Sequence, residues 1–306
     1  MSDSLPVDSS IAVIKVGGSI LKGKRAYRRA ARYVRNRHAV SPHERFVVVV
    51  SAQEGVTDRL AVTACQVVPQ PSPSALDLLW STGELRSVAL LALHLQALGI
   101  SAAPLNIHEA GLTIPDPARV ANTPPHDIRI NSRRLRSVLS QHSVAVVPGF
   151  FATDATGAVR SLGRGGSDLT AVLLAKGLNA ASCELLKDVC GYFTSDPYGN
   201  PGARHLPHLT FEEALTLADH GCDLLQRQAI ELAAQCNLPL VVRSLNDSAP
   251  VSRVTAEREL TSPNVAFTPE AAVGHLRERL CRKISFQARN RIPRTQEIPQ
   301  SKGARR

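Results

Sequence analysis

The sequence lacks the long apolar segment that a membrane-spanning helix requires. None of its apolar runs approaches about 18 consecutive residues. Its first residues, MSDSLPVDSS, are polar and lack the basic and then apolar layout of a secretory signal. Its six cysteines form no CxxC pair, so reduced thiols in the core are the expected state. We therefore expect a cytoplasmic protein with no membrane partner, no disulfide and no resident metal site.

Positive charge is in small excess along most of the chain and is concentrated at its C-terminus. Residues 274–306 contain ten Lys and Arg against two Asp and Glu, which accounts for +8 of the formal net charge of +10. An excess confined to a polar, proline-containing tail does not favour specific nucleic-acid binding, although RNA or an acidic partner stays an open alternative. We expect residues 1–9 to be disordered, and residues 259–306 to form a basic tail, helical at 270–285 and then disordered.

Length and composition fit a globular α/β protein. The 306 residues are 43% hydrophobic and 20% charged, and a chain of this length buries a sizeable core without disulfides. Short, β-branched apolar runs alternate with helical patterns, an order typical of parallel strands covered on both faces in a doubly wound sheet. The predicted strands are 11–16, 46–52, 144–151, 183–189 and 238–245, and the predicted helices are 26–37, 84–98, 168–177, 211–220 and 223–236.

The stretch KVGGS has the composition of a phosphate-binding turn. A predicted strand runs into Gly17, Gly18 and Ser19, where backbone N–H groups can point at an anion. Lys15, at the end of the strand, adds a point charge suited to a phosphate. An ordinary glycine-rich turn has the same composition, so this stretch alone leaves both interpretations open.

The stretch GRGGSD connects the strand ending near Phe150 to a helical sequence. Ser167 or Asp168 is the expected N-cap, and the glycines leave the helix N-terminus free to face a ligand. Arg164 adds a guanidinium that can hold a carboxylate or a phosphate in two places. A dinucleotide site is poorly supported because the last glycine of GxGxxG is missing, and a capped turn without function is the competing interpretation.

The stretch LLKDVCGYFTSDPYGNP follows a predicted buried strand that ends at Lys187 and Asp188. Tyr192 or Phe193 suits contact with a purine, and Asp188 or Asp196 suits a nucleotide or its magnesium ion. An aromatic side chain packed beneath a surface turn is the alternative.

Together and in this order, these motifs resemble the amino acid kinase family, and within it the catalytic domain of aspartate kinases. The resemblance covers about residues 10–255 and implies a three-layer α/β/α sandwich with a mostly parallel central sheet over 10–258. It also implies an acceptor half, about 10–155, and a nucleotide half, about 156–258. The matching stretches are KVGGS, VSAQEGVTDRL, TGELRS, VVPGFFATDATGAVRSLGRGGSD, KDVCGYFTSDP and LTFEEALTLADHGCDLLQRQAIELA.

The activity implied by the resemblance is phosphoryl transfer from Mg-ATP to the side-chain carboxylate of L-aspartate, which gives an acyl phosphate. Its cofactors are ATP and the Mg²⁺ carried with it. Such a reaction depends on positioning and electrostatic stabilisation, and the acceptor is already ionised at neutral pH, so no strong general base is needed.

The resemblance also implies a role for individual residues. Lys15 and Asp168 are the implied catalytic residues, with Asp168 orienting the lysine. The implied substrate-binding residues are Ser51, Thr57, Glu84, Arg164 and Ser167, with Glu84 meeting the α-ammonium and Arg164 the α-carboxylate of the amino acid. The implied nucleotide-binding residues are Gly17, Gly18, Ser19, Lys187, Asp188, Phe193 and Asp196.

The nucleotide half departs from the family pattern at two related places. Where the family reads TDVDG, this chain reads KDVCG from Lys187 to Gly191. The lysine of the family's GAKVLHP motif, which faces the ATP phosphates, falls on Asp223, so the local charge is reversed. We hypothesise that Lys187 supplies the charge that Asp223 lacks.

Two other functions stay open. A kinase for another carboxylate, of the N-acetylglutamate or aminoadipate type, is the first, but an acylated nitrogen would not need the charge of Glu84. The second is a catalytically impaired paralogue that binds nucleotide or amino acid and regulates a partner enzyme, which Asp223 favours and the retained Lys15 and Asp168 oppose.

Assembly is predicted from the resemblance alone. Only residues 256–306 follow the matched region, so we expect no pair of ACT domains in this chain. Feedback would then require a separate regulatory subunit. Relatives commonly pair, so a homodimer is expected.

Overall fold

The computed structural model describes residues 10–257, with a few gaps. Predictions for residues 1–9 and 259–306, the helix at 270–285 included, lie outside the described residues. The gaps are Lys24, residues 116–123, Arg164, Asp196, Tyr198, Gly199 and Asp247, together with the side chain of His126.

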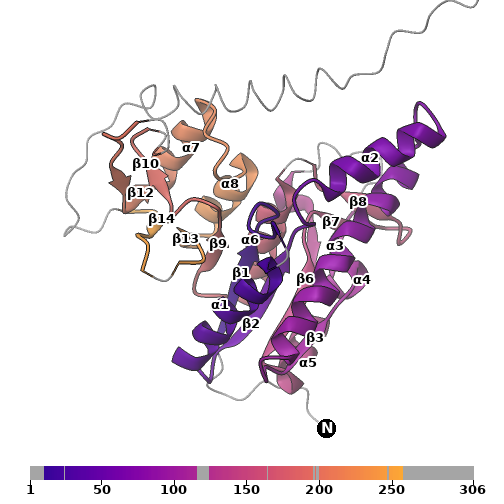
Figure 1. Ribbon diagram of the computed structural model, residues 1–306, viewed down its shortest axis with the longest axis horizontal. Coiled ribbons are helices and arrows are strands. Elements are labelled where there is room, and N and C mark those ends of the chain that lie inside the picture. Colours follow the sequence, from indigo (N-terminus) through magenta and orange to yellow (C-terminus); the bar gives the residue numbers. More distant parts are fainter. Residues whose placement is uncertain are drawn as a thin grey trace, which may run out of the picture.

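An eight-stranded sheet crosses the molecule, and its adjacent strands are parallel except for one antiparallel pair, β13–β14 (Figure 1). Strands β1 and β9 are neighbours in the sheet although they are far apart in sequence. The chain first forms the strands on the β2 side of β1 and then those on its β9 side. In spatial order the strands are β12 (His208–Thr210), β14 (Ser252–Thr255), β13 (Leu240–Arg243), β9 (Cys183–Leu186), β1 (Ile11–Val16), β2 (Arg45–Val50), β6 (Val144–Pro148) and β3 (Ala102–Pro104).

Helices cover both faces of this sheet, which explains why β1 and β2 are apolar without alternation. Val13 and Val47 belong to one hydrophobic core, while Ile14 and Val48 belong to a second core on the opposite face. The resulting three layers confirm the predicted fold class. Helices α1 (Ala26–Val40) and α3 (Pro73–Gln96) contribute to the second core, and α5 (Arg133–Gln141), α6 (Gly166–Leu178), α7 (Phe211–Asp219) and α8 (Arg227–Gln235) contribute to the first.

Smaller elements border the sheet at the ends of its strands. The helices are α2 (Val56–Val67), α4 (Ile107–Ala110) and the 3₁₀ turn η2 (Pro125–Asp127). A four-stranded sheet has the order β5 (Arg129–Ile130), β4 (Leu112–Ile114), β7 (Phe151–Asp154) and β8 (Val159–Ser161), and a two-stranded sheet pairs β10 (Tyr192–Phe193) with β11 (His205–Leu206).

Local structure differs from the prediction where tertiary contacts decide it. The strand predicted at 144–151 ends at Pro148, and Phe150, with φ 71°, turns the chain into the second sheet. Helix α2 was not predicted, because Val56 is the one buried residue in it and no apolar face marks it. Helix α3 begins well before residue 84, at Pro73, behind the N-cap Ser72.

One helix begins with a reciprocal cap, and the cysteines differ in burial. Thr210 and Glu213 form a capping box at the start of α7, each side chain accepting from the other's backbone N–H. Of the five described cysteines, Cys183 and Cys222 are buried as expected, whereas Cys65 is exposed, so the prediction of a core thiol is wrong there. Cys281 lies outside the described residues. Among the described helices, none is both long and apolar enough to cross a bilayer.

Candidate active site

Two lysines converge on one buried carboxylate. The Nζ of Lys15 lies 2.8 Å from Oδ1 of Asp168, and the Nζ of Lys187 lies 2.8 Å from its Oδ2. The three side chains are 8%, 13% and 5% exposed for Lys15, Lys187 and Asp168. The cluster contains two cations and one anion, so it presents an excess of positive charge in a setting with little water.

The sheet topology brings these three residues together. Lys15 is in β1 and Lys187 directly follows β9, and the two strands are parallel neighbours whose carboxyl ends lie at one edge. Asp168 is in the first turn of α6, which packs against β1. The chain order reverses between β1 and β9, and ligands of open α/β sheets bind at such a switch point.

Burial and charge act together on the pKa values of Asp168 and Lys187. Burial alone would raise the pKa of Asp168, but the charges of Lys15 and Lys187 hold it well below its usual range. Burial lowers the pKa of Lys187 to about 8, although the Asp168 carboxylate opposes that change. The backbone N–H of Gln226 also donates to Oδ2 of Asp168, at 3.3 Å. The carboxylate is therefore the fixed anion of the site.

The glycines of KVGGS permit close approach of neighbouring groups. A Cβ at Gly17 would lie 3.3 Å from the Lys15 Nζ, and a Cβ at Gly18 would lie 2.5 Å from the carbonyl oxygen of Ala52. The Gly18 carbonyl also accepts from the N–H of Glu54 at 3.1 Å. The segment forms a turn, and α1 begins only at Ala26, so Gly17 to Ser19 do not form a helix N-terminus.

The start of α6 corrects the predicted cap. The N-cap is Gly165, in the left-handed region at φ 77°, and not Ser167 or Asp168. A side chain at Gly165 would press on Gln226, and one at Gly149 would collide with the buried Ser167. Both glycines allow other segments to lie against the first turn of α6. Arg164, predicted to bind a carboxylate, lies outside the described residues.

Glu84 has a buried carboxylate with unused hydrogen-bonding capacity. It is 4% exposed, and its Oε2 has no hydrogen-bond partner among the described residues. Burial raises its pKa to about 8, against the opposing effects of the Ala52 backbone N–H and the charge of Lys15. Gly83 allows this arrangement, since a Cβ there would lie 3.2 Å from that of Ala52. An unpaired buried carboxylate suits a cationic ligand group.

Ser51 and Thr57 flank the same loop. The N–H of Ser51 donates to the Val16 carbonyl at 3.1 Å, which places Ser51 at the end of β2 beside the KVGGS turn. Thr57 is in the first turn of α2, behind the left-handed N-cap Gly55. Both side chains are half-buried. This loop connects the KVGGS turn to Glu84 through Ala52.

The predicted nucleotide side chains lie beyond β9. Asp188 is exposed, and burial lowers the pKa of Lys187 although the charge of Asp188 is among the effects that oppose this change. Phe193 is half-buried, with its ring edge-on to His205 at 5.3 Å, whereas Tyr192 is fully buried. Of the two predicted aromatic residues, Phe193 is therefore the one with surface available to a base. Asp196 lies outside the described residues, and Asp223 is exposed.

Several residues near the site were not predicted. Phe150 adopts a left-handed conformation that is rare for a bulky residue, and its N–H donates to Thr170 Oγ1 at 3.1 Å. Its ring lies 6.4 Å from that of Trp80, one turn before Glu84 in α3. The break at Gly149 was the available signal for this turn. No sequence signal indicated the backbone contacts of Ala52 and Gln226.

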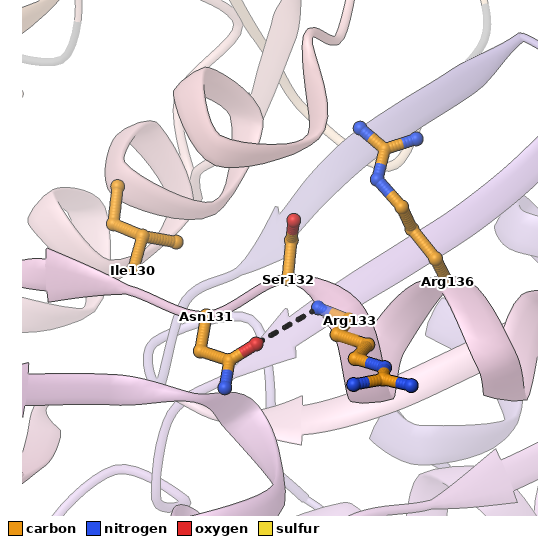
Figure 2. A pocket seen from close by; sticks show the side chains of 5 residues that line it. All are labelled: Ile130, Asn131, Ser132, Arg133 and Arg136. Atoms are coloured by element: carbon orange, nitrogen blue, oxygen red, sulfur yellow. Dashed lines mark hydrogen bonds between the residues drawn. The ribbon is translucent and has the colours of Figure 1, made fainter.

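A separate cavity of about 490 Å³ lies at the start of α5 (Figure 2). Asn131 accepts there from the backbone N–H of Arg133, and Figure 2 shows the side chains of Arg133 and Arg136 extending in different directions. Its lining residue Ile130 packs against Gly177, at the opposite end of α6 from Asp168. None of the predicted site residues lines this cavity.

Comparisons with known proteins agree with the fold and the motif order. The model of the amino acid kinase family matches residues 10–244. The aspartokinase of Pseudomonas aeruginosa is 38% identical over 213 residues, covering 70% of this chain and 51% of that protein. The aspartokinase of Thermus thermophilus is 36% identical over 261 residues, covering 84% of this chain and 63% of that protein. The chain thus spans between half and two thirds of these relatives.

Solved structures show the same arrangement of elements. The aspartate kinase from Synechocystis superimposes with a TM-score of 0.69 at 34% identity, over 84% of this chain and 41% of that one. Aspartokinase III of E. coli, in complex with aspartate and ADP, has a TM-score of 0.67 over 82% of this chain and 65% of that one. At 23% identity, the second likeness concerns the fold alone.

Proposed function

The chain belongs to the amino acid kinase family, and we propose that it transfers the γ-phosphoryl group of ATP to the side-chain carboxylate of L-aspartate. The observation that carries the proposal is the Lys15–Asp168 ion pair at the switch point of the sheet, with the glycines of KVGGS beside it. A buried cation next to unobstructed backbone is what a transferring phosphoryl group requires.

In this proposal the acceptor binds beside Glu84. The unpaired Oε2 of Glu84 receives the α-ammonium group, and Arg164 holds the α-carboxylate, a role that comes from the resemblance. Ser51, Thr57 and Ser167 border the same space. The acceptor carboxylate then points toward Lys15. The charge of Lys15 already acts on Glu84, where it opposes the rise in pKa that burial causes.

The chemical step is an in-line displacement at phosphorus. A carboxylate oxygen of aspartate forms a bond to the γ-phosphorus, the bond to the β,γ-bridging oxygen breaks, and ADP leaves with that electron pair. No proton needs to be removed from the acceptor, which is ionised at neutral pH. Lys15 and the N–H groups of Gly17, Gly18 and Ser19 stabilise the charge on the transferring group, and Asp168 orients Lys15.

The nucleotide occupies the β9 side of the site in the same proposal. Phe193 would border the base, and the resemblance assigns Asp188 and Asp196 to the nucleotide or to the Mg²⁺ that accompanies ATP. Residues of about 10–155 then form the acceptor half and about 156–258 the nucleotide half. Aspartate and ADP are the ligands of the E. coli aspartokinase III structure, and we propose the same pair for this chain.

Two alternatives to this function are compared with it. Asp223, exposed where a lysine was expected, favours a regulatory paralogue that binds ligands without turnover. A kinase for N-acetylglutamate or an aminoadipate-type acid would use the same phosphoryl site. The free carboxylate of Glu84 favours an acceptor with an α-ammonium group over an acylated one.

A substrate panel tests the proposal. The purified chain is incubated with Mg-ATP, hydroxylamine and either aspartate, N-acetylglutamate or aminoadipate, and the hydroxamate is measured. We expect the highest rate with aspartate. A higher rate with another acid would change the substrate, and ligand binding without any hydroxamate would favour the regulatory paralogue.

Cellular context and assembly belong to the same proposal. We propose that the protein is a cytoplasmic homodimer. Light scattering coupled to size exclusion measures the oligomeric state directly, and a monomeric mass would refute the dimer.

A further inference from the structure

Lys187 and Lys15 both pair with the carboxylate of Asp168, and two cations on one anion favour the binding of a second anion. Oδ1 of Asp168 is already paired with Lys15 at 2.8 Å, so the added lysine at Oδ2 leaves the cluster with more positive than negative charge. Removing a long cation from water without full neutralisation is costly. An incoming anionic group would offset that cost.

The geometry points to Lys187 as a phosphate-contacting catalytic residue, the second cation on the ATP phosphates beside Lys15. This inference rests on the proposed function, because it requires ATP as the ligand. It assigns the phosphates to the edge of the sheet where β1 and β9 end, and where the Asp168 carboxylate contacts both ammonium groups.

Contacts of both the backbone and the side chain of Lys187 fix its position at this edge. Its N–H donates to the Arg243 carbonyl at 2.9 Å, which continues the β9–β13 pairing past the end of the strand. The side chain is 13% exposed and its Nζ meets Asp168 at 2.8 Å. The ammonium group is therefore preorganised before any ligand binds, as electrostatic catalysis requires.

The neighbouring segment explains why the cation comes from β9. Residues 222–226 pass beside the cluster. The Gln226 N–H donates to Asp168, and the charge of Lys187 opposes the rise that burial causes in the pKa of the Cys222 thiol. That segment carries Asp223, which is exposed and has the wrong sign for phosphate. Lys187 contacts the same Asp168 oxygen as the Gln226 N–H does, and it keeps the site cationic.

Protonation is compatible with this role. Burial lowers the pKa of Lys187 to about 8, so the side chain is mostly charged at neutral pH. A bound phosphate would stabilise the charged form further, because an anion close to an ammonium group raises its pKa.

The test compares Lys187→Met with Lys176→Met in the full chain. Lys176 is an exposed lysine in the last turn of α6 and serves as the matched control. We expect Lys187→Met to raise the Kd of the non-hydrolysable analogue AMP-PNP, with Mg²⁺, at least about tenfold, as for one lost charge-assisted hydrogen bond. The kcat should fall about 10²-fold, with the KM for aspartate changed less than about threefold. Lys176→Met should match the wild type.

Unchanged AMP-PNP affinity and kcat in Lys187→Met would overturn the inference. If that variant does not fold, Lys187→Arg and Lys187→Gln replace it. An AMP-PNP affinity that is retained in Lys187→Arg and lost in Lys187→Gln supports the role. Equal AMP-PNP affinities of the two variants contradict it. A wild type that binds AMP-PNP through Lys187 yet phosphorylates no acid would refute the proposed function alone. An active wild type with an unaffected Lys187→Met would refute this inference alone.

Discussion

The carboxylate of Asp168 holds Lys187 at 2.8 Å with the oxygen that Lys15 does not use. One side chain of α6 therefore ties together the ends of two adjacent strands, β1 and β9. These strands are distant in sequence, so the contact joins the two halves of the chain at the point where the proposed phosphoryl transfer occurs.

Replacing Asp168 with Asn should remove both ion pairs while preserving the shape of the side chain. Two buried lysines would lose their anion, so we expect a loss of about 3–5 kcal/mol in the free energy of unfolding, as for other broken buried pairs. The kcat should fall about 10²–10³-fold, because Lys15 loses its orientation. Urea denaturation and steady-state kinetics measure the two effects. A variant as active as the wild type would contradict the proposed role.

Nucleotide affinity should depend on pH through Lys187. Because burial lowers the pKa of this lysine to about 8, its charge is present below pH 8 and is lost as the pH rises through that value. We expect the Kd of AMP-PNP to increase above pH 8 in the wild type. In Lys187→Arg, whose guanidinium stays protonated, the Kd should stay flat over the same range. Identical profiles for both proteins would show that another group titrates.

Aspartate binding should release a proton from Glu84. Burial raises the pKa of this carboxyl to about 8, so at pH 7 the free protein holds it mostly protonated, while the α-ammonium group binds its ionised form. We expect proton release at pH 7 and tighter binding as the pH rises toward 8. Calorimetry in two buffers with different ionisation enthalpies detects the proton. Equal binding enthalpies in both buffers, or unchanged binding by Glu84→Gln, would argue against the contact.

Gly18 should tolerate no side chain. A Cβ there would lie 2.5 Å from the Ala52 carbonyl oxygen, a backbone atom that cannot rotate away. We expect Gly18→Ala to lower the free energy of unfolding by about 1–3 kcal/mol, as for overpacked sites, and to lower kcat as the KVGGS turn shifts. The control is Gly202→Ala, which is exposed and would meet only the Asn200 side chain. Equal stability of both variants would show that the turn is not tightly packed.

The sequence predicted the parts of the fold that depend on local pattern. The apolar runs of β1, β2 and β9 were identifiable because short, β-branched apolar runs are typical of parallel strands covered on both faces. The parallel strands then place their carboxyl ends at one edge. Lys15 was correctly predicted in β1, whereas Lys187, predicted inside a strand at 183–189, directly follows β9, which ends at Leu186.

Contacts between distant segments were not predictable in the same way. The cap of α6 is Gly165 because its left-handed backbone turns the chain, whereas Ser167 is buried against Gly149. The position of Glu84 depends on Gly83 packing against Ala52, which no pattern in the helix indicates. The conformation of Phe150 has no sequence signature either, since bulky residues rarely adopt positive φ.

The most direct test of the proposed function is the hydroxamate rate with aspartate and Mg-ATP, measured for the wild type beside Lys15→Met. The account predicts steady hydroxamate formation by the wild type and a rate about 10²–10³-fold lower for the variant, because the buried cation next to Gly17 is lost. A folded wild type that forms no hydroxamate, or a Lys15→Met variant of equal rate, would contradict it.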